Sequence, residues 1–146
     1  MDIIFLGSTG VHHALLAANM YLGRVNELSD LRYIKGLYDY SKDVSGFPIY
    51  IGKDIEGNRV YTLGGGKEIW LTKKSIEQLL NMFGYSEHDL MVRTVNLIGD
   101  KIIHSLNKIP GLLGRHYLNM YLSGFIVKRN FAKLKQETEE FKSRLN

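Results

Sequence analysis

The chain has 146 residues, 45% of them hydrophobic and 23% charged, which is ordinary for one soluble globular domain spanning residues 1–146. The absence of cysteine excludes disulfides, thiolate catalysis and cysteine-ligated metal, and it fits a cytoplasmic protein. No apolar run approaches the roughly 20 residues of a membrane span. Most of the net charge of +4 lies at the C-terminal end, where we favour a solvated basic helix over nucleic-acid binding.

The first 23 residues predict a strand, a glycine-bearing loop and a helix. Ile3–Leu6 is an apolar run that suits a buried strand, Gly7–His13 follows as a loop, and Gly23 is expected to end the helix. Such a turn aims backbone N–H groups and the positive helix end at one point, which suits an anion. We interpret it as a P-loop-like or Rossmann-like unit, although neither Walker A nor G-x-G-x-x-G is complete. A tight turn that binds nothing is the alternative.

Residues 24–47 have no clean period, and they form either a lid or a packed connection. Leucines and an isoleucine at spacing three permit a short helix that begins near Ser29 or Asp30. Pro48–Leu63 is predicted to be a β-hairpin, because two β-prone runs flank a turn containing Gly57. The three glycines that follow are interpreted as a flexible exit, or alternatively as a place where backbone approaches a ligand.

The second half of the chain predicts two helices and two strands. One helix begins at Thr72 as its N-cap and ends at Gly84, with an apolar face of Ile76, Leu79, Leu80 and Phe83. Leu90–Val95 and Phe125–Val127 are strand candidates, and Asn130 is expected to cap the last helix. The apolar stripe of that helix is Phe131, Leu134, Thr138, Phe141 and Leu145. The expected fold is therefore a three-layer α/β domain with a largely parallel sheet and an inserted hairpin.

The candidate site lies where the predicted strands end, because open α/β sheets bind ligands beyond the carboxyl ends of their strands. The candidate ligand-binding residues are Gly7, Ser8, Thr9, Gly10, His12, His13, Asn96, Arg129 and Asn130, with Asp100 at the same edge. His12 is the candidate acid, base or nucleophile, and when protonated it would add a charge-assisted hydrogen bond to a phosphate. His12 and His13 point about 100° apart on a helix, so we predict no metal site, and the sequence names no cofactor.

Several of these segments resemble a known family. They are Gly10-x-His12, Ile51-Gly52-x-Asp54, Gly57-Asn58-x-Val60-Tyr61-x-Leu63-Gly64, Val95-Asn96 and the segment after Gly124. Together they are similar to an uncharacterised bacterial family, known mainly from Firmicutes, called domain of unknown function 3189. The resemblance spans nearly the whole chain, and its central segment is the most specific part. It implies a shared fold and carries over no activity.

Two classes of function follow from the sequence. The first is a protein that binds a phosphorylated small molecule or nucleotide at the Gly7–His13 loop, whether or not it is an enzyme. The second is a non-enzymatic regulatory or assembly protein that acts through an aromatic patch in residues 24–47 or through the basic C-terminal helix. The sequence leaves the oligomeric state open.

Overall fold

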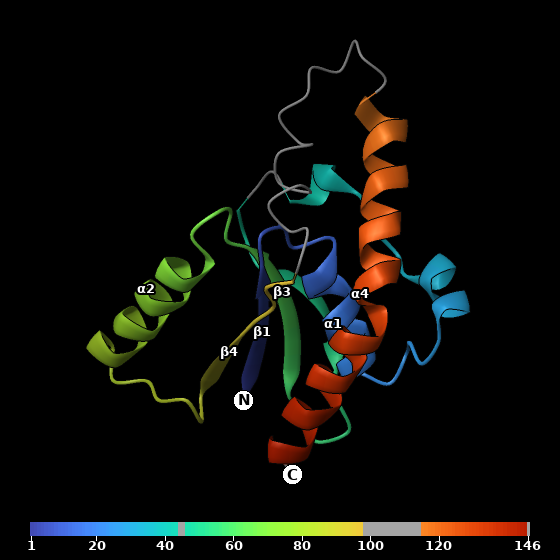
Figure 1. Cartoon of the computed structure of the whole chain (residues 1–146). Coiled ribbons are helices and arrows are strands. Elements are labelled where there is room, and N and C mark those ends of the chain that lie inside the picture. Colours follow the sequence, from blue (N-terminus) through green and yellow to red (C-terminus); the bar gives the residue numbers. More distant parts are fainter. Residues whose placement is uncertain (44–45, 98–114, 146) are drawn as a thin grey trace.

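Four strands form one open sheet in the order β2-β3-β1-β4, in a computed structural model that describes residues 1–43, 46–97 and 115–145 (Figure 1). They are β1 (Asp2–Gly7), β2 (Ile49–Lys53), β3 (Arg59–Gly64) and β4 (Leu90–Thr94). β1 pairs in parallel with both β3 and β4, whereas β2 and β3 form an antiparallel hairpin. The predicted strands Ile3–Leu6 and Leu90–Val95, which correspond to β1 and β4, and the predicted hairpin are therefore confirmed.

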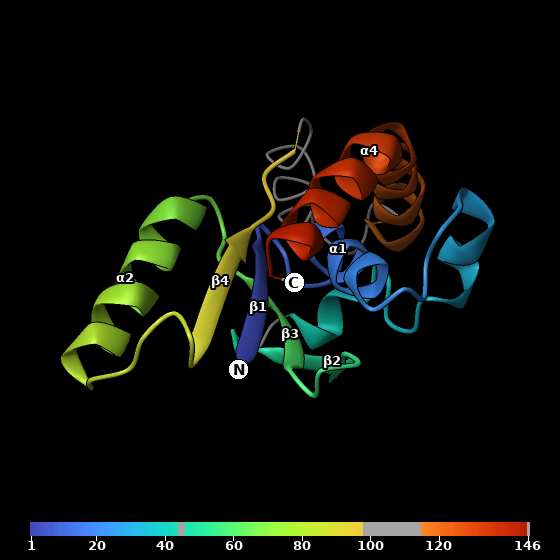
Figure 2. The ribbon, with the colours of Figure 1, turned by 90° about the horizontal axis from the view of Figure 1, so that it is seen from below.

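Helices lie on both faces of this mostly parallel sheet (Figure 2). They are α1 (His13–Tyr21) and α4 (Arg115–Leu145) on one face and α2 (Ile69–Met82) on the other, with 3-10 helices η1 (Leu28–Tyr33) and η2 (Tyr40–Lys42) between α1 and β2. Alternation along β1 explains the arrangement, because successive side chains of a strand point to opposite faces. Ile3 and Phe5 pack with α1 and α4, while Ile4 and Leu6 pack with Ile69 of α2.

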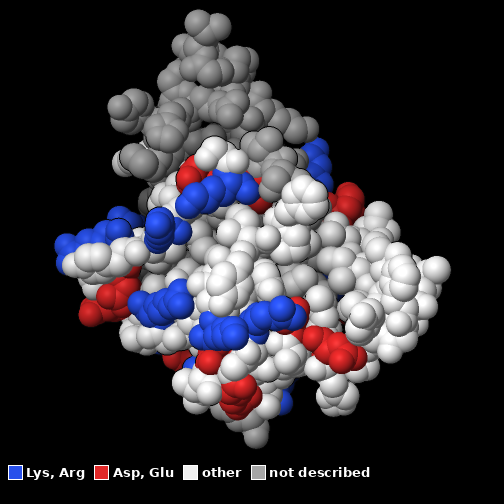
Figure 3. Space-filling view, turned by 180° about the vertical axis from the view of Figure 1, so that it is seen from behind, with Lys and Arg blue, Asp and Glu red and all other residues white. Residues whose placement is uncertain are grey.

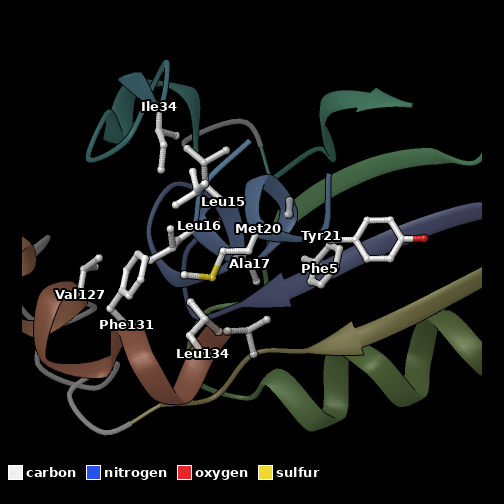
Figure 4. Packing of buried hydrophobic residues seen from close by; sticks show 14 of the residues in the cluster. Phe5, Leu15, Leu16, Ala17, Met20, Tyr21, Ile34, Val127, Phe131 and Leu134 are labelled. Atoms are coloured by element: carbon white, nitrogen blue, oxygen red, sulfur yellow. The ribbon is translucent and has the colours of Figure 1, made fainter. Parts of the chain in front are cut away.

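The main core lies between the sheet, α1 and α4. Every residue of α1 is buried, because α4 and the connection to β2 cover the sides that the sheet leaves open. Figure 4 shows Leu16 of α1 close to Phe131 of α4, and Phe5 beside Tyr21. Gly23 follows α1 with φ +71°, the left-handed conformation that glycine adopts most easily, so the predicted helix end is confirmed.

The prediction of a third parallel strand at Phe125–Val127 is wrong, because this segment lies inside α4, as does Asn130, which therefore caps no helix. Val127 is fully buried while Phe125 is 62% exposed, as expected for two positions on different sides of a helix. The predicted apolar stripe is confirmed: its first four members are buried and Leu145 packs against the same core. Although α4 has 31 residues, no helix in the described part of the chain is apolar enough over sufficient length to cross a membrane.

The start of α2 also differs from the prediction. The helix begins at Ile69, with Glu68 as its N-cap residue, so Thr72 lies within its first turn. There the Thr72 hydroxyl donates to the carbonyl oxygen of Glu68 at 3.2 Å. The predicted apolar face is only partly used, because Ile76 packs on the sheet while Phe83, just beyond the helix, is 74% exposed.

Candidate functional site

After β1 and after β3, the chain turns to opposite faces of the sheet. β1 leads into α1 on one face of the sheet, and β3 leads into α2 on the other face. The two strands are neighbours and parallel, so their carboxyl ends lie side by side. In open α/β sheets, ligands bind in the crevice outside such a pair of strand ends. The fold therefore directs attention to the loops after Gly7 and Gly64.

These two loops are joined by backbone hydrogen bonds. The N–H of Gly65 donates to the carbonyl oxygen of Gly7 at 2.8 Å, and the N–H of Gly66 donates to that of Ser8 at 3.1 Å. A Cβ atom built on Gly64 would lie 3.0 Å from the backbone nitrogen of Gly10, closer than side chains normally approach. We call Gly7–Gly10 together with Gly64–Gly66 the glycine cradle. The second glycine run, interpreted from the sequence as a flexible exit or as a place where backbone approaches a ligand, packs closely against the first loop of the chain itself.

A carboxylate of the chain itself lies in the glycine cradle. Asp43, which follows η2, accepts a hydrogen bond from the backbone N–H of Gly10 through Oδ1 at 2.8 Å. The Cβ built on Gly64 would lie only 2.6 Å from the same oxygen and 3.0 Å from Oδ2. Any residue larger than glycine at position 64 would therefore displace this carboxylate. The first loop thus donates a backbone N–H to a carboxylate of the chain itself.

His12 is buried beneath the loop, with an exposed fraction of 1%. Its Nδ1 shares a hydrogen bond of 2.7 Å with the Thr9 hydroxyl, and its ring lies 5.4 Å from that of Tyr38, centre to centre. Burial, and to a lesser extent the neighbouring His13, lowers the pKa of His12 from 6.5 to about 3. At neutral pH the ring is therefore uncharged. This differs from the charge-assisted hydrogen bond expected from the sequence, because desolvation of the imidazolium was not visible there.

The other polar side chains of the first loop are also buried: Ser8 is 8% exposed, Thr9 2% and His13 2%. The part of the loop that contacts the Asp43 carboxylate is therefore its backbone, at the N–H of Gly10. Tyr38 helps to hold this arrangement, because its N–H donates to the carbonyl oxygen of Val11 at 3.0 Å. Burial raises the pKa of Tyr38 to about 12.

The remaining predicted site residues are more scattered. Asn96 follows β4 at the same edge as the glycine cradle, because the N–H of Val95 donates to the carbonyl oxygen of Leu6, and its side chain is exposed. Arg129 and Asn130 lie in the middle of α4, and the Asn130 amide donates to the helical carbonyl oxygen of Ile126 at 2.9 Å. Asp100 falls outside the described residues.

Sequence reasoning missed Asp43. It lies 33 residues from Gly10 in the chain, within a segment that shows no period. Among the side chains that the structure describes, no three His, Asp or Glu residues are close enough together to hold a metal ion.

Comparison with known proteins places these features in a family. The family model described as "Protein of unknown function (DUF3189)" matches residues 2–143, which confirms the resemblance found in the sequence. No curated protein matches the chain, and neither does any solved structure.

Proposed function

We propose that this chain, which belongs to the DUF3189 family of proteins of unknown function, binds a phosphorylated small molecule or nucleotide by its phosphate in the glycine cradle. The observation that carries the proposal is the hydrogen bond from the Gly10 N–H to the Asp43 carboxylate. A phosphate offers the same kind of oxygen acceptor with more charge, at the start of a helix whose dipole favours anions. In this proposal, β1, the loop and α1 act as a P-loop-like unit.

Asp43 has a definite role in such a site. Its carboxylate accepts the N–H that a phosphate oxygen would accept, so the two anions compete for the glycine cradle. A bound phosphate has to displace the carboxylate. The apparent affinity for phosphate is therefore the intrinsic affinity multiplied by the fraction of molecules in which the carboxylate has left the glycine cradle. The proposed function is binding, because His12, the candidate acid, base or nucleophile, is buried and uncharged where it supports the loop.

We expect Asp43→Ala to bind inorganic phosphate more tightly than the wild type does. Removing a charged acceptor worth about 1.5–3 kcal/mol frees the Gly10 N–H, which corresponds to roughly tenfold or more in affinity. Gly64→Ala should instead abolish phosphate binding, because its Cβ takes the place of the anion. Calorimetric titration with phosphate measures both effects, and the amide NMR signals of Gly10 and Gly65 report where phosphate binds.

The matched control is Gly124→Ala, the same substitution within α4, where the added Cβ meets its nearest atom at an ordinary 3.6 Å. It should bind phosphate as the wild type does. Equal phosphate affinity in wild type, Asp43→Ala and Gly64→Ala would refute the proposal. Thermal unfolding of each variant separates a lost site from a lost fold.

A regulatory or assembly role is the second candidate function. Two lysines of the basic C-terminal helix are used within the fold, because Lys135 and Lys142 each donate to a backbone carbonyl oxygen at 3.0 Å. In residues 24–47 the aromatic side chains of Tyr33 and Phe47 are exposed, and a further feature that favours this role is the exposed apolar surface of α2 and the turn after it. Its members are Trp70, Leu71, Leu79, Met82, Phe83 and Tyr85. Light scattering at increasing protein concentration tests whether this surface associates, with Phe83→Ser as the comparison.

A further inference from the structure

A second candidate site is a cleft between α1, η1 and β2. Its volume is about 400 Å³, which is in the range of small-molecule sites. Leu15 and Asn19 line it from α1, one helical turn apart, and Ile34 lines it from the end of η1. Figure 4 shows Leu15 pointing toward Ile34, on the other side of α1 from the contact between Leu16 and Phe131. We call this cavity the α1 cleft.

The inner part of the α1 cleft is apolar. Its apolar lining residues, from α1, β2 and the segments before and between them, are Val11, Leu15, Val25, Ile34, Ile49 and Ile51. Burial of apolar surface in such a cavity stabilises a complex by about 25 cal/mol per Å² removed from water. The lining therefore suits the hydrocarbon body of an organic molecule.

The charges around the α1 cleft are mostly positive. Arg24, Lys35 and Lys42 line it, against the single carboxylate of Asp30. That carboxylate already accepts two backbone N–H groups at the start of η1, at 2.8 and 3.0 Å. Lys42 forms only a loose, half-exposed ion pair with Asp39 at 3.8 Å, which is weak in water. The excess of cations favours an anionic ligand.

Arg24 is held in the wall of the α1 cleft by a specific arrangement. Its Nη1 donates to the carbonyl oxygen of Ile51 at 3.0 Å, on the edge strand β2. A Cβ atom built on Gly52 would lie 2.5 Å from Nη2 of the same guanidinium. In this position the guanidinium fills the space beside Gly52. Figure 3 shows Lys and Arg side chains gathered on the face that carries β2, with uncharged side chains toward α2.

We propose that the α1 cleft binds a small organic acid. The apolar body of the ligand lies against Ile49 and Ile51, which are half-buried, and its acidic group lies among Arg24, Lys35 and Lys42. This site requires neither Asp43 nor the glycine cradle, so it stands independently of the phosphate proposal.

The test uses octanoate as the acidic probe and 1-octanol as its uncharged counterpart, titrated into the ¹⁵N-labelled protein at low ionic strength. Octanoate should shift the amide signals of Leu15, Asn19 and Ile51, and it should bind more tightly than 1-octanol. The double variant Lys35→Gln/Lys42→Gln should bind octanoate about fivefold or more weakly than the wild type, an effect that added salt reduces.

The matched control is Lys53→Gln/Lys67→Gln, which removes the same charge from exposed positions outside the α1 cleft and should bind octanoate as the wild type does. Equal affinities for the two double variants would overturn the proposal, as would equal affinities for octanoate and 1-octanol. Shifts confined to Leu79, Met82 and Phe83 would overturn it as well, because they would place the probe on α2.

Discussion

Replacing Phe141 with alanine is expected to lower the free energy of unfolding by about 3–5 kcal/mol, the range for a large aromatic side chain lost from a core. Phe141 is 8% exposed. Its ring lies 5.8 Å from that of Phe5 on β1 and 6.0 Å from that of Tyr21 on α1, centre to centre. One side chain of α4 therefore joins the last helix to the sheet and to α1. Urea denaturation followed by circular dichroism measures the loss.

The control for this prediction is on the same helix. Phe125→Ala removes an equal number of atoms from a ring that is 62% exposed, so its cost should stay within roughly 0.5 kcal/mol. If Phe141→Ala costs no more than Phe125→Ala, α4 does not pack on the sheet as described. A change in the slope of the denaturation curve would show instead that the variant alters the unfolded state.

Much of the sheet was predictable because each strand is coded locally. The apolar run at Ile3–Leu6 is buried on both faces, between α1 and α2, and so it contains no polar alternation. The hairpin was predictable for a different reason. Its turn contains Gly57, with φ +84°, beside Asp54, whose carboxylate accepts the N–H groups of Glu56 and Asn58.

The false strand at Phe125–Val127 shows where a local pattern is ambiguous. Three apolar residues in a row after a glycine fit a short buried strand and a helix equally well. The helical spacing decides the matter, because the buried stripe continues backward from Phe131 through Val127 to Ser123 at intervals of four. Gly124 precedes these three residues within α4, and a single glycine within a helix costs only about 1 kcal/mol, which the packing of a long helix readily offsets.

The sequence indicates the glycine-bearing loop of the candidate site, but it does not indicate which residues approach that loop. The spacing of glycines after β1 indicated a loop able to receive an anion, and the structure shows Gly10 donating to one. Asp43 and Gly64 reach that loop only through the tertiary fold, so no local pattern connects them with it. The charge state of His12 could not be predicted from the sequence either, because it depends on burial beside Tyr38 and on the nearby His13.

That charge state leads to a prediction about pH. The pKa of His12 is about 3 in the folded protein and 6.5 when the side chain is in water. Between these values the unfolded chain binds a proton that the folded chain excludes, so the free energy of unfolding falls as the pH falls below 6.5. Between pH 7 and about pH 4.5, the loss due to His12 should be about 2–3 kcal/mol.

The variant that isolates this loss is His12→Asn, compared with the wild type by urea denaturation at several pH values. His12→Asn is expected to be less stable at pH 7, because it loses buried ring contacts, but its stability should decline less steeply toward about pH 4.5. The comparison of slopes removes the constant cost of the substitution. Backbone N–H groups lower the pKa of Asp30 and Asp89, so these carboxylates lose their stabilising effect mainly below this range. An unchanged slope in His12→Asn would mean that His12 is accessible to protons in the folded state, and the loop above it would then be open to water.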